Sequence, residues 1–354
     1  MAENSVVTIG NVFDLLKFRH PDGSPVDTMA YALAERDDMA RLMPSYPTNQ
    51  GITHSGLRQI ALPTGYLVTL GGSWKASKGK WEPVNEALCM VKSTYQSPKD
   101  HFKQYEEAVG KMLFKAEKAA HVMALSQQWN RLMIDGTSTP NQAGINGLMK
   151  RAPYLTYDNK FTFSVGGTGS DLRSCWLMKP GVDTIHLLHN KNHPTMGIEQ
   201  EDKGEQLIDG LGTGSDEHRW DIMIEFALEK GLFILDQRGC KRICNVPCGV
   251  SDNPGSDLIN TIIDASLINS PTGGTLEVQA EGKVEEKNSN WLLFCDERLY
   301  SKLVRTQNDK VMVYQSTENI YRTKLPMIGS DIVICRMDAL NHEVGSGETE
   351  VQAA

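Results

Sequence analysis

The sequence lacks a long hydrophobic run. No stretch approaches the roughly 18 consecutive apolar residues of a membrane-spanning helix, and Met1–Ser5 carry neither a basic start nor an apolar segment. We therefore expect neither a membrane span nor a secretory signal peptide. Basic residues are also in deficit, with 36 Lys and Arg against 44 Asp and Glu, a formal net charge of −8. This charge opposes tight binding to nucleic-acid phosphates, so a DNA-binding module is not expected.

Motifs that carry catalysis are scarce as well. The sequence has no Gly-x-Ser-x-Gly elbow, and its carboxylates show no local pairing typical of an acid–base site. Two glycine-rich runs, 166–171 and 210–216, lack both the lysine of a phosphate-binding loop and a following apolar helix, which indicates turns. We predict no catalytic residue, no cofactor and no enzymatic activity.

The seven cysteines indicate packing residues rather than a metal site. An odd number without an export signal predicts reduced thiols. Cys240, Cys244 and Cys248 are evenly spaced by four residues. Structural zinc sites bring their ligands in pairs two to four residues apart and need four, so three cysteines with Pro247 between the last two are a poor match. The apolar alternation around Lys241–Val246 predicts a strand that places these cysteines on one buried face.

Three histidines lie within eight residues, at His186, His189 and His193. No carboxylate accompanies them at helical spacing, and the run 185–189 predicts a strand, on which positions three apart face opposite sides. We interpret them as surface or interface histidines. The alternative is a metal-dependent hydrolase in which they would act with a nearby carboxylate from Glu199, Glu201 or Asp202.

A long hairpin is predicted before the middle of the chain. Its arms, Leu57–Leu70 and Val84–Ser93, carry alternating or β-branched apolar residues, and its tip, Gly71–Trp81, is rich in Gly, Ser, Lys and Trp. An isolated two-stranded ribbon is marginal in water, so we expect its faces to pack on a neighbouring subunit. The candidate intersubunit contacts are Trp74, Lys75, Lys78, Lys80 and Trp81.

A very long amphipathic helix is predicted over Ser97–Asp135. Ser97 fits an N-cap, Pro98 the first helical position, and Gly136 lies just past the end. Apolar residues recur between these ends at steps of three and four. At about 1.5 Å per residue such a helix is roughly 55 Å long.

The remaining pattern predicts an α+β chain. Two short helices, Ser5–Phe18 and Asp27–Met43, form an N-terminal arm. Strands over 161–165, 174–179 and 184–189, with a long pair over 220–228 and 231–246, form one β-rich layer. The last part contains helices over 257–269 and 296–305, strands over 290–295, 311–314 and 331–336, and a frayed tail over 345–354.

This order of elements resembles the major capsid protein fold of tailed double-stranded DNA bacteriophages, the Hong Kong 97-like or Johnson fold. The residues that carry the resemblance are those of a capsid family from short-tailed phages. They are Gly166–Ser170, Ser174–Met178, Thr184–His186, Arg219–Asp221, Gly231–Asp236 and Arg242–Asn245. The resemblance covers most of the chain.

The resemblance implies a domain layout. Residues 1–50 would form the N-terminal arm and 51–96 the extended E-loop. Residues 97–246 would form the peripheral domain, with a spine helix over 97–135 and a long β-ribbon over 220–246. Residues 247–327 would form the axial domain, and 328–354 a closing strand and flexible tail.

The resemblance also implies the function of a virion shell subunit that assembles in the host cytoplasm. Such subunits form homopentamers and homohexamers, work with a scaffolding protein, a portal and in some phages a decoration protein, and enclose double-stranded DNA without specific binding. Some members cross-link through an E-loop lysine, but nothing in this sequence identifies the acceptor. A tail or decoration protein is the other structural possibility.

Overall fold

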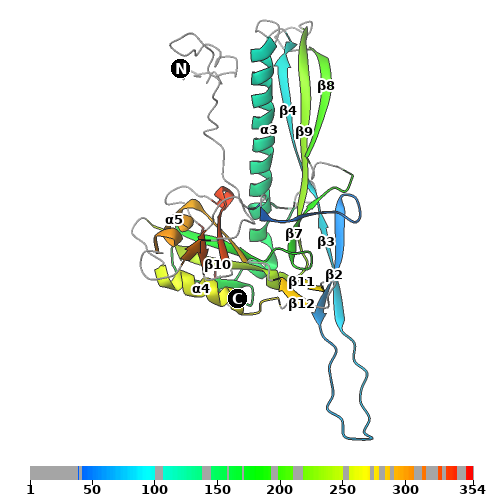
Figure 1. Ribbon diagram of the computed structural model, residues 1–354, viewed down its shortest axis with the longest axis vertical. Coiled ribbons are helices and arrows are strands. Elements are labelled where there is room, and N and C mark those ends of the chain that lie inside the picture. The colour runs from blue at the N-terminus through cyan, green and yellow to red at the C-terminus, as the bar shows by residue number, and fades with distance from the viewer. Residues whose placement is uncertain are drawn as a thin grey trace, which may run out of the picture. The chain divides into compact units, whose positions relative to one another are not determined.

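The computed structural model describes residues 39, 42–99, 107–137, 145–157, 159–169, 171–192, 198–209, 218–249, 255–271, 275–278, 284–287, 291–306, 313–315, 326–328, 332–340 and 348–353. The predicted helix Ser5–Phe18, nearly all of Asp27–Met43, and His193 lie outside these ranges. Within them the chain is of the mixed α+β class, with sheets of seven, five, two and two strands (Figure 1). The predicted fold class is confirmed.

The chain divides into two compact units. One consists of Met1–Glu35, Val91–Ser126 and Ile198–Leu228, and the other of Arg36–Met90, Gln127–Gly197 and Glu229–Ala354. We call them unit 1 and unit 2. Each is built from segments that are distant in the sequence, so neither matches a single continuous stretch.

Unit 2 contains the seven-stranded sheet, in the order β14-β15-β16-β13-β6-β10-β5. Its strands are β5 (Thr162–Ser164), β6 (Leu172–Met178), β10 (Cys240–Pro247), β13 (Trp291–Cys295), β14 (Val313–Gln315), β15 (Pro326–Ile328) and β16 (Ile332–Arg336). Pairing is parallel between β10 and β5 and between β13 and β16, and antiparallel elsewhere. Every residue of β6 and β13 is buried, as expected for central strands covered on both faces.

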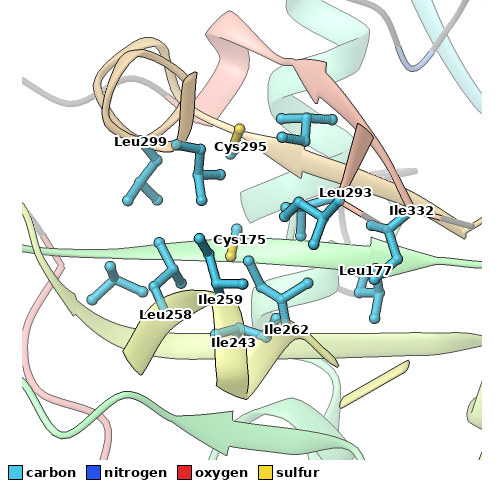
Figure 2. Packing of buried hydrophobic residues seen from close by; sticks show 14 of the residues in the cluster. Cys175, Leu177, Ile243, Leu258, Ile259, Ile262, Leu293, Cys295, Leu299 and Ile332 are labelled. Carbon is cyan, nitrogen blue, oxygen red and sulfur yellow. The ribbon is translucent and has the colours of Figure 1, made fainter. Parts of the chain in front are cut away.

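Two helices complete this core, α4 (Gly255–Leu267) and α5 (Glu297–Thr306). The apolar residues of α4 recur at helical spacing and enter one cluster with those of β6, β10, β13, β16 and α5 (Figure 2). Asp296 caps α5, since its carboxylate accepts the backbone N–H of Leu299 at 2.8 Å. The cluster consists of Cys175, Leu177, Ile243, Val246, Cys248, Leu258, Ile259, Ile262, Ala265, Trp291, Leu293, Cys295, Leu299, Leu303, Ile328, Ile332 and Ile334.

The predicted single β-rich layer is wrong, because β7 (Ile185–His189) belongs to the second sheet. That sheet has the order β1-β7-β9-β4, with β8 also paired to β9. Its other strands are β1 (Ser45–Pro47), β4 (Cys89–Pro98), β8 (Ile198–Asp209) and β9 (His218–Ile234).

The predicted ribbon over 220–246 is also wrong. Residues 218–234 form one continuous strand that pairs antiparallel with β8, and β10 lies in the other sheet. The pattern placed a turn before Gly231, but this glycine lies inside β9. A Cβ there would lie 3.1 Å from the Ala87 carbonyl oxygen, so glycine permits a close backbone approach.

The long helix α3 is described over Glu107–Asp135. Its predicted end at Asp135 and the following Gly136 are confirmed, and a Cβ at Gly136 would lie 2.1 Å from the Leu132 carbonyl oxygen. Its predicted start is wrong, because Ser97 and Pro98 belong to β4, with Lys99 helical and 100–106 outside the described ranges. A Ser-Pro pair also suits the end of a strand, so it does not by itself mark a cap.

Within unit 1, α3 packs on β4 and β9 through aromatic residues. The His121 ring stacks on Phe226 with centroids 5.5 Å apart and meets Tyr95 edge-on at 5.8 Å. His121 Nδ1 and the Ser93 hydroxyl lie 2.6 Å apart, which satisfies the ring. These contacts hold one face of the helix, as the amphipathic pattern predicts.

The predicted flexible tail is wrong for residues 348–353. The Glu348 carboxylate accepts hydrogen bonds from the Arg242 guanidinium at 2.6 Å and the Ser174 hydroxyl at 2.5 Å. Its backbone pairs with Leu172, and the Asn245 side chain bonds both N–H and C=O of Val351. The tail is therefore held because it neutralises a buried arginine, a partner more than one hundred residues away in sequence.

Candidate subunit interface

The predicted hairpin exists, with different arms. Strand β2 (Thr53–Ala61) pairs antiparallel with β3 (Lys80–Ala87), in a register that runs from Thr53 opposite Ala87 to Gln59 opposite Trp81. The first predicted arm ends at Ala61, because Pro63 and Gly65 interrupt the ladder. The second arm is divided at Leu88 into β3 and β4. Residues 62–79 form a long connecting loop without strand structure.

The outer face of the hairpin exposes apolar side chains. Leu57 and Trp81 have 65% and 60% of their surface accessible, and Pro83 pairs with Leu57 across the ladder. Trp81 pairs with the polar Gln59, so this face groups three apolar residues beside one polar one. Exposed apolar residues grouped in this way are typical of a protein contact surface.

The connecting loop adds more exposed apolar side chains. Leu67 and Leu70 are fully exposed, and Trp74 is 74% exposed. The other exposed large apolar side chains of the hairpin and its base are Ile52, Ile60, Leu62, Tyr66 and Val68. Leu62, Tyr66, Leu67, Val68 and Leu70 were not among the predicted contacts. The signal that could have found them is an apolar run bounded by Pro63, Gly65 and two glycines.

The structure brings the predicted contact residues together on this element. Trp74, Lys75 and Lys78 lie in the loop, and Lys80 and Trp81 begin β3, all five exposed. Residues 62–81 contain three lysines and no acidic residue. The surface is therefore basic as well as apolar, in a chain that is acidic as a whole. Their role as contacts remains a prediction.

A groove of about 620 Å³ lies beneath the inner face of the hairpin. Its walls are β2, one residue of β3, the two residues before β5, and the segment that follows β9. It contains both signs of charge: Arg58 pairs with Glu82 at 2.7 Å, and Arg238 pairs with Asp236 at 2.7 Å. The lining residues are Leu57–Leu62, Glu82, Lys160, Phe161, Leu235–Arg238 and Asn269.

The cysteines are packing residues. All seven are buried and none forms a disulfide. Burial raises the pKa of Cys240 to about 12, of Cys244 to about 11 and of Cys248 to about 12, so the thiols are protonated at neutral pH. The predicted single face is wrong for Cys248, which joins the cluster of Figure 2 with Ile243. The ladder shifts register between Ile243 and Val246, at the positive φ of Asn245, and this breaks the alternation.

His186 and His189, the two of the three histidines that the structure describes, do not form a surface group. His186 is buried, its ring lies edge-on to Tyr46 at 4.9 Å, and its Nδ1 lies 3.2 Å from the Gly181 carbonyl oxygen. His189 is half-buried, with its Nδ1 2.8 Å from the Ser45 hydroxyl. Burial lowers the pKa of both rings. The prediction of surface or interface histidines is therefore wrong for His186, because β7 is covered on both faces.

The carboxylates of the hydrolase alternative serve other contacts. Glu201 pairs with Lys203, and Lys203 also lies 3.6 Å from Glu225. In the described part of the chain, no group of three His, Cys, Asp or Glu residues is placed to hold a metal ion. Nor does any described helix have the length and apolarity needed to cross a membrane.

Comparisons with known proteins agree with this architecture. A chain in the structure of bacteriophage Epsilon15 superposes with a TM-score of 0.64 at 17% identity, covering 98% of this chain and 99% of that chain. The bacteriophage JBD30 capsid aligns over 88% of this chain and 93% of that one, at 10% identity and a TM-score of 0.44. No curated protein sequence matches the chain. The superposition on the Epsilon15 chain shows the Hong Kong 97-like capsid fold that the sequence resemblance implied.

A family comparison supplies the identity. The family described as Major capsid protein GP7 matches residues 20–347, nearly the whole chain. This family is a structural capsid family rather than an enzyme family. The chain belongs to the Major capsid protein GP7 family, and its function is to form the capsid shell of a tailed bacteriophage virion.

Proposed function

We propose that the β2–β3 hairpin and its loop are the E-loop, the element by which each subunit holds its neighbour in the shell. The observation that carries the proposal is the apolar surface of residues 57–81, which has no covering partner among the described residues. Exposure of the leucines and the tryptophan of this loop to water is unfavourable, and their burial against another copy lowers the free energy.

The domain layout follows the same proposal. Residues 1–50 are the N-terminal arm, 51–96 the E-loop, 97–246 the peripheral domain with α3 as its spine helix, and 247–327 the axial domain. In place of the predicted ribbon over 220–246, the long β-ribbon is the antiparallel pair β8–β9. The closing strand is β16, and residues 348–353 form a docked segment.

We further propose that the subunits form homopentamers and homohexamers. Many modest contacts per subunit stabilise such a shell, since repeated weak contacts act together while single errors can still be reversed. A scaffolding protein, a portal and a decoration protein are the expected partners. The shell encloses double-stranded DNA without specific binding, which suits a net charge of −8, and the subunit has no catalytic activity.

A loop replacement tests the proposal. Residues 62–79 would be exchanged for an Asn-Gly turn that joins β2 directly to β3. The variant should fold, since the loop contributes nothing to the cluster of Figure 2. It should form no closed shells in negative-stain electron microscopy under conditions in which the unaltered protein does. Shells of normal size and number from a folded variant would contradict the proposal.

A further inference from the structure

Among the described residues, several contacts hold the base of the hairpin on the rest of unit 2: the Asn49 side chain bonds the backbone of Ser55, and Ala87 lies close to Gly231. On the β2 side, the His54 ring meets Phe233 edge-on at 4.6 Å. One step further, a Cβ on Gly56 would lie 2.7 Å from Phe233 Cζ, so only glycine lets β2 lie this close to β9. These contacts fix one strand of the ribbon.

The other strand is fixed by an ion pair at the same level. Glu86 pairs with His54 in the ladder, and its carboxylate accepts two hydrogen bonds from the Arg151 guanidinium, at 2.6 and 3.2 Å. Both side chains are mostly buried, with 18% and 15% of their surface exposed. Arg151 is itself oriented by its Nε, which donates to the Asn146 carbonyl oxygen at 3.1 Å. A two-pronged pair held in this way fixes a direction as well as a distance.

Beyond this level, within the described part of the chain, the inner face of the hairpin from Leu57 to Leu62 borders the groove described above. Side chains from the two residues before β5 and from the segment after β9 form the far wall of this groove. A ribbon held on only one strand can pivot about that strand, whereas a ribbon held on both cannot.

We propose that the Glu86–Arg151 ion pair is a latch that sets the angle at which the hairpin leaves the subunit. This proposal deepens the proposed function and rests on it, because the angle matters only if the hairpin contacts a second copy of the chain. Opening the latch frees the hairpin to pivot at His54–Gly56. The closed latch thereby restricts the positions at which a neighbouring subunit can contact the exposed Leu57–Trp81 surface.

The chain supplies a matched control. Arg58 and Glu82 also form an arginine–glutamate pair, at 2.7 Å, but both residues belong to the hairpin itself. Breaking this pair removes the same kind of interaction without detaching either strand from the body. A change in the angle of the hairpin that is caused by opening the latch should therefore appear in Glu86→Gln and be absent in Glu82→Gln.

The test measures the angle of the hairpin in the unassembled full-length subunit. Spin labels on Gln59→Cys, on the exposed outer face of β2, and on Val182→Cys, an exposed turn of unit 2, report one distance by double electron–electron resonance. All seven native cysteines are buried, so labelling is confined to the two introduced thiols. We expect a narrow distribution for the parent and for Glu82→Gln, and a wider, shifted one for Glu86→Gln.

Two further variants keep the test decisive. Exchange of the two charges, Glu86→Arg with Arg151→Glu, should restore a narrow distribution, whereas a merely misfolded hairpin would not recover. Arg151→Gln serves as a second opening of the latch if Glu86→Gln melts at a lower temperature. An unchanged distribution in folded Glu86→Gln and Arg151→Gln overturns the latch, even if loss of the loop blocks shell formation. Conversely, suppose that the distance distribution widens in Glu86→Gln while the loop-replaced variant forms normal shells. That result supports the latch and contradicts the proposed interface.

Discussion

Truncation of Trp74 should separate folding from assembly. A tryptophan side chain presents about 250 Å² of surface. Trp74 is 74% exposed, so about 60 Å² is covered within the subunit. At about 25 cal/mol per Å², Trp74→Ala costs the unassembled subunit no more than about 1.5 kcal/mol. The remaining surface of about 190 Å², if buried by a neighbour, contributes up to about 5 kcal/mol to each contact.

Two measurements check this difference. Thermal melting followed by circular dichroism on unassembled subunits should show a small shift for Trp74→Ala. Negative-stain counts of shells at matched protein concentration should show a large loss, because every contact in the shell is weakened by roughly 2 kcal/mol or more. Trp220→Ala is the control, since it removes an indole that is also 55% exposed but lies on β9, outside the hairpin.

The reasoning would be refuted by either of two results. If Trp74→Ala unfolds the subunit but the surviving protein assembles normally, the loop is an internal element. If Trp220→Ala reduces shell formation as much as Trp74→Ala, the effect is a general response to losing exposed indole surface and says nothing of the hairpin.

Three further predictions concern unit 2. Glu348→Ala leaves the Arg242 charge buried and unpaired, so urea unfolding should show a loss of about 3–5 kcal/mol, and Glu348→Gln, which keeps hydrogen-bond acceptors, a smaller one. Burial lowers the pKa of Lys241 from 10.5 to about 8. Between about pH 8 and pH 10.5 the unfolded chain then binds more protons than the folded one, so the free energy of unfolding should rise with pH by on the order of 3 kcal/mol. Lys241→Met should flatten this dependence of the unfolding free energy on pH. Cys244→Ala should cost on the order of 1 kcal/mol, and a chelator should leave assembly intact; stoichiometric zinc in purified shells would contradict the packing role of the cysteines.

The elements that the sequence predicted well are those whose signal is local. The apolar spacing of Leu258, Ile259 and Ile262 predicts α4, and the continuous apolar run of β13 predicts a buried strand, because each pattern repeats the geometry of its own element. The hairpin and its exposure were predicted for the same reason. Nothing beyond the run 57–93 was needed to see that the two arms could not bury each other.

The errors lie where a distant partner decides the structure. Gly231 has the pattern of a turn, but it lies inside the continuous strand β9, where the backbone of Ala87 from another strand approaches it closely. Glu348 lies in a stretch that has the pattern of a frayed tail, but its carboxylate accepts hydrogen bonds from the buried side chains of Arg242 and Ser174. His186 has the pattern of a surface group, but Tyr46 and Phe233 cover it. A single sequence does not reveal such pairings, since no local pattern encodes them.

The contacts that stabilise the folded subunit and the surface proposed for assembly involve different residues. The central strands β6 and β13 are buried at every residue, and the Arg242–Glu348 pair ties the last described segment to them. These contacts are complete within one copy. The leucines of the loop and Trp74 expose most of their surface in that copy. A mutation among the buried core contacts therefore changes whether the subunit folds, whereas a mutation in the loop changes how folded subunits assemble. The Glu86–Arg151 latch belongs to both groups, because its side chains are mostly buried within one copy while they set the angle of the element that contacts another.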